Sequence, residues 1–136
     1  MDHIFDQNQP IYLQILQRIY AKILRGEYIP GEKLPSVIDA AIFFKVNHNT
    51  IARVYSEMVR SGIAVIKRGE GTFVTEDQTV LRQLHETMRC SLLEDFFTEM
   101  LRLGYSSSEI VEALEQFIHN QETGPNRSQE IGAINR

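Results

Sequence analysis

Hydrophobic residues recur every three or four positions through most of this chain, which predicts a series of amphipathic helices. The first helix opens at Pro10, since the first helical position tolerates proline, and ends at residues 25–26. A second helix begins at residue 35 or 36 and runs to Phe44. The residues expected on the buried faces are Ile11, Ile15, Ile19 and Ile23 in the first helix, and Val37, Ala40, Ala41 and Phe44 in the second.

A third helix follows Asn47, whose side-chain oxygen can accept hydrogen bonds from the unpaired N–H groups of the next turn. It ends at Ser61 and Gly62, with glycine at the usual position after a helix. Residues 63–66 and 72–74 then read as two strands of a hairpin. The third helix is expected to bury Ile51, Val54, Tyr55 and Met58 and to expose His48, Asn49, Ala52, Arg53 and Ser56.

Two helices joined by a polar turn, followed at once by a short hairpin, predict a winged helix-turn-helix over residues 1–76. The fold class is mainly α with a small β-wing. This arrangement places one helix end and one hairpin against duplex DNA, so double-stranded DNA is the expected partner.

The second half of the chain predicts a long helix that starts near Thr79 and breaks at Gly104, and a further helix capped by residues 106–108. Two helices are too few to enclose a core of their own, so we expect residues 77–121 to form a dimerisation module covered by a second copy of the chain. The alternative is a monomer in which both helices fold onto their own winged domain. From Glu122 the composition is polar and aperiodic, which predicts a disordered tail over 122–136. The expected dimer contacts are Leu81, Leu84, Met88, Leu92, Phe96, Met100, Leu114 and Phe117.

Charge is distributed unevenly along the chain. The net charge is −4, but residues 1–75 carry nine Lys/Arg against seven Asp/Glu, and residues 76–136 carry five against eleven. The front half is therefore +2 and the back half −6. Because +2 is weakly basic for a DNA-binding domain, binding would depend on a local basic patch and on its duplication by a dimer.

The residues expected to contact DNA lie at three places. The N-terminal turn of the third helix would enter the major groove, polar and basic residues around the second helix would contact the sugar–phosphate backbone, and the hairpin tip would approach the minor groove. Each has a structural alternative: Asn47 as a cap only, Arg53 paired with Glu57, and the hairpin glycines as turn formers. The full set is Asn47, His48, Asn49, Thr50 and Arg53, then Lys33, Ser36 and Lys45, then Lys67, Arg68, Gly69 and Gly71.

Other functions find little support in the residues. The four histidines and Cys90 have no metal-ligand spacing, and neither a phosphate-binding glycine loop nor a nucleophile–base pair stands out, so we expect no enzyme activity, metal or cofactor. A single cysteine, a start without signal-peptide features and no apolar run near ~20 residues are consistent with a cytoplasmic protein that does not enter membranes. A small-molecule effector, whose identity is unknown, would have to use a groove at the dimer interface.

The segments Leu34-Pro35-Ser36, residues 46–55, Ser61-Gly62 and residues 68–74 resemble the winged domain of GntR-type bacterial transcription regulators. The string from Asn47 to Tyr55 and the short second half are most similar to the YtrA subgroup. This resemblance implies a homodimeric, repressor-like protein on a two-fold operator, often one that controls a transporter operon.

Three positions depart from the family pattern. Ile38 stands where the family commonly has an arginine that contacts DNA, Lys45 stands where it commonly has glycine, and the acidic Glu70 lies between the hairpin glycines. Loss of one arginine contact costs about 1–3 kcal/mol of binding free energy. We therefore expect modest affinity or an altered operator. The alternative function is a degenerate winged-helix module that binds proteins and has weak or no DNA binding.

Overall fold

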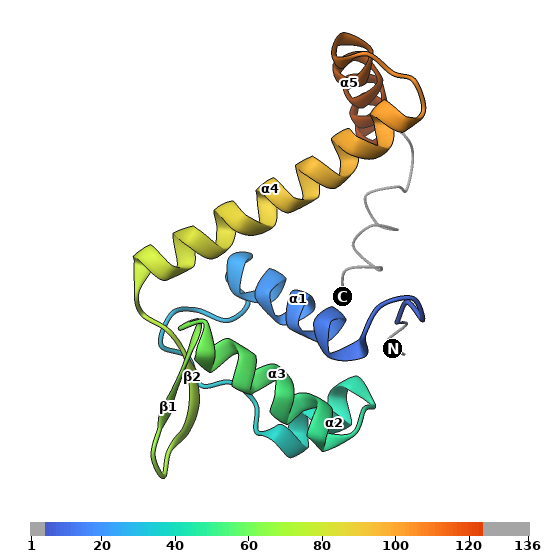
Figure 1. Cartoon of the computed structure of the whole chain (residues 1–136). Helices are drawn as coiled ribbons and strands as arrows, with labels where there is room; N and C mark the ends of the chain where they lie inside the picture. The colour runs from blue at the N-terminus through green and yellow to red at the C-terminus, as the bar shows by residue number, and fades with distance from the viewer. Residues whose placement is uncertain (1–4, 124–136) are drawn as a thin grey trace. The chain divides into compact units, whose positions relative to one another are not determined.

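The computed structural model describes residues 5–123 (Figure 1). The chain divides into two compact units, with the boundary between Thr87 and Met88. The first unit contains α1 (Ile11–Leu24), α2 (Val37–Phe44), α3 (His48–Arg60), β1 (Ala64–Lys67), β2 (Gly71–Val74) and the start of α4 (Gln78–Arg102). The second unit contains the remainder of α4 and α5 (Ser107–Thr123). This order of elements confirms the predicted mainly helical fold with a small β-wing.

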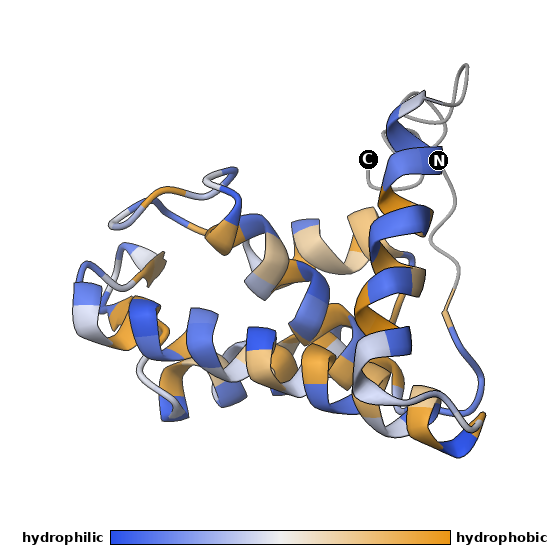
Figure 2. Ribbon diagram, turned by 90° about the horizontal axis from the view of Figure 1, so that it is seen from above, coloured by the Kyte–Doolittle hydropathy of each residue, from blue (hydrophilic) through white to orange (hydrophobic). Residues whose placement is uncertain are grey.

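The core of the first unit comes from the apolar stripes of α1, α2 and α3. Ile15, Ile19 and Ile23 are buried as predicted, whereas Ile11 is 46% exposed at the start of α1. Pro10 precedes the helix as its cap residue rather than opening it. Along the helices hydrophobic segments alternate with hydrophilic ones (Figure 2), as the spacing predicts. In α3 the four inward residues are all buried: Ile51, Val54, Tyr55 and Met58.

The connection between α2 and α3 is a tight turn with a cap at each helix start. The Ser36 hydroxyl oxygen accepts a hydrogen bond from the Asp39 N–H at 3.1 Å, and the Asn47 side-chain oxygen accepts one from the Asn49 N–H at 2.8 Å. Between them Lys45 adopts φ 57° and ψ 48°, and no other non-glycine residue of the range 5–123 has positive φ. This left-handed backbone is the conformation predicted at the position where the family commonly has glycine.

The wing is an antiparallel pair in which Ala64 faces Val74 and Lys67 faces Gly71. Strand β1 lies one residue later than predicted at both ends, and β2 begins one residue earlier than predicted. The later start of β1 has a local reason, since the Ile63 N–H donates to the Met58 carbonyl and so closes the end of α3. Residues 31–34, in the connection between α1 and α2, also join the wing. The Gly31 N–H donates to the Val74 carbonyl at 2.9 Å, and the Leu34 N–H donates to the Thr72 carbonyl at 2.8 Å.

The first turns of α4 belong to the winged unit. The Asp77 carboxylate caps the helix by accepting from the Thr79 N–H at 2.9 Å. Val80, Leu81 and Leu84 are partly buried against the winged core. Leu81 and Leu84, expected at a dimer interface, thus also contact the core of their own unit, and the compact unit that contains this core extends to Thr87 within α4. Their place at a dimer interface stays a prediction.

The second unit is a helix–turn–helix with little interior of its own. Gly104 has φ 92° and lies just after α4, and α5 then starts with a reciprocal cap. The Glu109 N–H donates to the Ser106 hydroxyl at 3.3 Å, and the Ser106 N–H donates to the Glu109 carboxylate at 3.0 Å. The bonds from the Ser106 backbone and hydroxyl lower the pKa of Glu109.

Helix α5 runs two residues further than expected. It continues through Glu122 and Thr123, where the Thr123 hydroxyl donates to the His119 carbonyl at 2.9 Å. Their polar composition predicts that these two residues belong to the tail, and the structure corrects this prediction. The remainder of the predicted tail, residues 124–136, lies outside the described residues. Within residues 5–123 no helix combines the length and the apolar composition needed to cross a membrane.

Candidate nucleic-acid interface

The N-terminal turn of α3 is presented to solvent. His48 and Asn49 are exposed, and Thr50 is partly buried. The Asn47 side chain is engaged as the helix cap, which agrees with the alternative that capping is its main role. The side chains of His48 and Asn49 both carry hydrogen-bonding groups, and both therefore project from the start of α3. In a helix that enters the major groove, side chains at this position can reach base edges.

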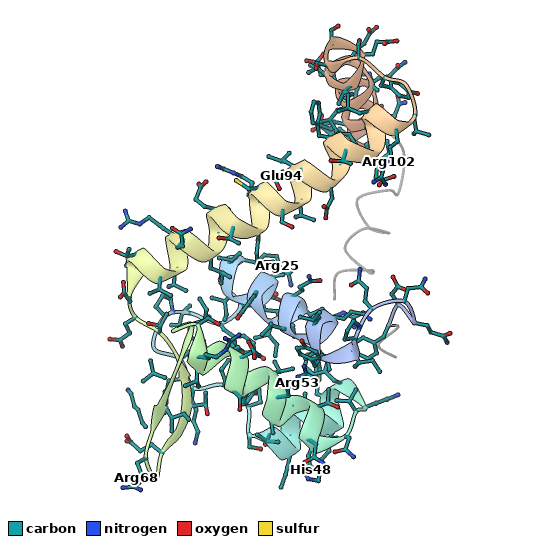
Figure 3. All side chains as sticks on the ribbon, in the orientation of Figure 1. Arg25, His48, Arg53, Arg68, Glu94 and Arg102 are labelled. Carbon is teal, nitrogen blue, oxygen red and sulfur yellow. The ribbon has the colours of Figure 1, made fainter. Side chains whose placement is uncertain are left out.

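The wing tip lies on the same edge of the first unit as this turn. Figure 3 shows Arg68 at the end of the hairpin and His48 at the start of α3, both at the lower edge of the unit. Both residues are exposed. Beside Arg68, the Lys67 ammonium lies 4.4 Å from the centre of the Phe73 ring, so this cation is held against the wing. We call this edge, with the α3 turn and the wing tip, the recognition edge.

The two hairpin glycines have separate backbone reasons. Gly69 has φ 79° with open space around it, so it serves the turn. Gly71 has φ 131°, and a Cβ there would lie 2.8 Å from Cε of Lys33. Lys33 also pairs with Phe73 through an isolated β-bridge, so the lysine stem crosses the wing at Gly71. This explains both glycines without DNA; their close approach to a minor groove stays a prediction.

Arg53 is exposed on α3, as predicted, and its side chain also contacts α1. Its guanidinium carbon is 3.6 Å from the centre of the Tyr12 ring, a stacked cation–π contact between α3 and α1. Figure 3 places it on the part of α3 near α1, away from the recognition edge. The alternative of an ion pair between Arg53 and Glu57 is not observed. The Glu57 carboxylate instead accepts a hydrogen bond from Arg60 at 2.6 Å. The role of Tyr12 was missed because only the packing of α1 on α3 reveals it.

Tyr55 connects α3 to the start of α2. Its hydroxyl donates to the Pro35 carbonyl at 2.6 Å, and its side chain is buried, as predicted for a core residue. Burial raises the pKa of Tyr55, with a smaller contribution from Tyr28. The phenol therefore stays protonated and keeps donating the hydrogen bond. This bond fixes the residue that precedes the Ser36 cap.

The remaining expected contact residues lie on α2 and its flanks. Ser36 is exposed while its oxygen caps α2, Lys45 is exposed in its left-handed conformation, and Ile38 is 67% exposed. Glu70 is exposed at the wing tip, beside Arg68. The start of α3 thus presents short polar side chains, and the wing tip presents the cation of Arg68 beside the carboxylate of Glu70.

This sequence and fold match known regulators. The family model described as bacterial regulatory proteins, gntR family, matches residues 11–74. The uncharacterized HTH-type transcriptional regulator YhcF of Bacillus subtilis is 44% identical over 117 residues, which cover 86% of this chain and 97% of that protein. The HTH-type transcriptional repressor YtrA of Bacillus subtilis is 33% identical over 108 residues, covering 79% and 83%. A GntR family transcriptional regulator from Listeria monocytogenes has a similar structure, with a TM-score of 0.78 at 37% identity, over 82% of this chain and 98% of that one.

Proposed function

Since this chain belongs to the GntR family of bacterial regulatory proteins, we propose that it represses transcription as a homodimer bound to a two-fold DNA operator. DNA binding and regulation of transcription are the functions of this family. The repressor role is supported by the name of the YtrA relative, whose length is 83% covered by the match. The observation that carries the proposal is the recognition edge, where the exposed start of α3 and Arg68 of the wing lie on one side of the unit.

In this proposal the start of α3 enters the major groove. His48, Asn49 and Thr50 are within reach of base edges there. Contacts to the phosphates come from the cations and hydroxyl around them, and these set the position of the protein without reading sequence. The proposed backbone contacts are Lys33, Ser36, Lys45, Lys67 and Arg68.

Homodimerisation is proposed from the second unit. Among residues 88–123 the only buried residue is Ile110, whereas large apolar side chains on α4 and α5 face solvent. Exposed clusters of this kind mark interaction surfaces, and a second copy of the same helices would bury them symmetrically. The exposed side chains are Leu92 at 69%, Leu93 at 56%, Phe96 at 38%, Phe97 at 43%, Leu101 at 48%, Val111 at 57%, Leu114 at 39%, Phe117 at 60% and Ile118 at 45%.

Binding-site selection with the full chain tests the proposed function. Random duplexes should yield an enriched sequence with two-fold symmetry, and its affinity should fall steeply as salt rises. Arg68→Ala should reduce the slope of log K against log salt by about one unit per bound subunit. Arg25→Ala is the matched control, because Arg25 ends α1 and pairs with Glu27, and its slope should equal that of the wild type. Failure to enrich any symmetric sequence would contradict the regulator.

The dimer is tested by mass. Light scattering at micromolar concentration should give twice the chain mass, and Phe96→Asp should give the monomer mass while the thermal transition of the winged unit is kept. Ile29→Asp is the control, since it places the same charge at a residue of the first unit that is 58% exposed. A monomeric wild type, or a dimeric Phe96→Asp variant, would overturn the interface.

The regulated genes are proposed from the family resemblance alone, as a transporter operon. Deleting the gene in its host should raise the transcripts of such an operon, and a reporter fused to its promoter should respond in the same way. Restoring the wild-type chain should lower both signals, and an Arg68→Ala chain should do so less. Unchanged transcripts of all transporter operons would refute this part of the proposal and leave the DNA-binding function standing.

A further inference from the structure

Helix α2 exposes two aliphatic side chains beside the start of the recognition helix. Ile38 is 67% exposed and Ile42 is 71% exposed, and they lie one helical turn apart on one side of α2. The opposite side of the helix buries Ala40, Ala41 and Phe44 in the core. The two isoleucines are thus a feature of the surface, and the fold does not account for them.

The surface around these isoleucines adjoins the recognition edge at the start of α3. Ile38, Ile42, Asn47 and His48 line one shallow cleft of about 360 Å³, together with Ala41 and Val46. Any duplex that receives the exposed start of α3 is therefore also brought next to the two isoleucines. The walls of the cleft are apolar on the α2 side and polar on the α3 side.

The chemistry of the groove identifies what the apolar wall would contact. Isoleucine gains nothing from phosphate oxygens, because it has neither charge nor hydrogen-bonding groups. In the major groove each base pair displays donors and acceptors, and thymine alone adds an apolar group, its C5-methyl. Contact between this methyl group and an aliphatic side chain removes apolar surface of both from water, which is favourable.

We propose that Ile38 and Ile42 read thymine methyl groups in each half-site of the operator, an inference that rests on the proposed DNA-binding function. The pair then contributes sequence preference for A·T or T·A pairs at the positions next to the start of α3. This assigns a role to the departure at Ile38, which the family resemblance presents only as a lost arginine contact. Loss of one buried methyl group weakens binding about fourfold per half-site.

The test removes the methyl group from the DNA rather than from the protein. In the duplex enriched by selection, each thymine is replaced in turn by deoxyuridine, which differs only by the C5-methyl group. The dissociation constant of the full wild-type chain should rise about fourfold when a contacted thymine is replaced in one half-site, and about 15-fold in both. Ile38→Ala or Ile42→Ala should bind the unmodified duplex more weakly and should be insensitive to at least one of these replacements.

Ile29→Ala is the matched control, since Ile29 is also exposed, at 58%, but lies in the loop after α1 and outside the cleft. It should keep the wild-type response to deoxyuridine. The inference is overturned if the wild type is indifferent to every replacement, or if both cleft variants keep the full deoxyuridine penalty, as they would if this wall bound a protein instead. Absence of any enriched duplex would refute the proposed function itself, and the two failures are therefore distinguishable.

Discussion

Replacing Tyr55 with phenylalanine tests how the recognition helix holds the start of α2. The Tyr55 hydroxyl donates to the Pro35 carbonyl at 2.6 Å, and the two residues are 20 positions apart in the chain. Pro35 is followed by Ser36, which caps α2. The substitution keeps the ring in the core and removes only the oxygen, so its effect reports the hydrogen bond.

The structure sets the size of the effect. Tyr55 is 6% exposed, so nearly all of its side chain is removed from water, and its hydrogen bond to Pro35 is partly buried. A hydrogen bond of this kind contributes about 1 kcal/mol, and a partly buried carbonyl left without its donor costs about 1–3 kcal/mol. We expect Tyr55→Phe to lower the free energy of unfolding by about 1–2 kcal/mol. For a domain of 60–100 residues each kcal/mol lowers the melting temperature by about 4–8 °C.

The assay is urea unfolding of the full chain followed by far-UV circular dichroism. Tyr105→Phe is the control, since Tyr105 is 40% exposed in the second unit and loses the same atom. The reasoning is refuted if Tyr55→Phe and Tyr105→Phe have equal free energies of unfolding within about 0.3 kcal/mol, below the smallest expected contribution of a hydrogen bond.

The pH dependence gives a second readout of the same bond. Burial raises the pKa of Tyr55 above its usual value, so the folded state binds the phenolic proton more tightly than the unfolded chain does. The contribution of the protonated Tyr55 hydroxyl to the free energy of unfolding is therefore complete below the unfolded-state pKa of about 10, and it declines as pH rises past this value. The gap between the wild type and Tyr55→Phe should narrow above that pH. A constant gap would contradict the burial of the hydroxyl.

Three further predictions concern local features of the winged unit. Lys45→Gly should raise the free energy of unfolding by about 0.5–1 kcal/mol in urea titration because glycine adopts positive φ without strain, and Lys45→Ala should not; equal effects would exclude backbone strain. Ser36→Ala should lower that free energy by about 1 kcal/mol through the lost α2 cap, and Ser36→Asp should keep the wild-type value, whereas an unchanged free energy in Ser36→Ala would exclude the cap. Tyr12→Leu should cost about 0.5–1 kcal/mol through the contact with Arg53, and the cost should vanish in an Arg53→Met background, with additive costs contradicting the stack.

Much of the winged unit could be predicted because its signals are local. The inward residues of α3 follow from their spacing, which places them on one face of any helix that forms there. Asn47 and Ser61-Gly62 delimit α3 through side-chain capping and positive φ, and both depend only on neighbouring residues. The left-handed backbone at Lys45 is expected from the family resemblance, because the family commonly has glycine at this position. For such features a few neighbouring residues are enough to predict the local backbone.

The features that could not be predicted depend on contacts between distant segments. The stack of Arg53 on Tyr12 needs α1 and α3 to be packed, and the pairing of residues 31–34 with β2 needs the completed wing. Leu81 and Leu84 continue the apolar stripe of α4, so periodicity alone cannot separate them from the exposed residues that follow. Periodicity identifies a buried face but not what buries it, and for this reason it cannot show that the start of α4 packs on the winged core.

The charge of the recognition edge links the two proposed interfaces. The cations proposed to contact phosphates on one copy are Lys33, Lys45, Lys67 and Arg68. If all of them reach phosphates, the slope of log K against log salt is about −3.6 for one copy and about −7 for two. One copy thus forms too few contacts for tight binding at physiological salt, and both half-sites must be occupied at once. Phe96→Asp should therefore weaken operator binding strongly although residue 96 belongs to the second unit, and should reduce the salt slope by about half. An unchanged slope would mean that the DNA-bound state does not need the apolar surface of α4 and α5.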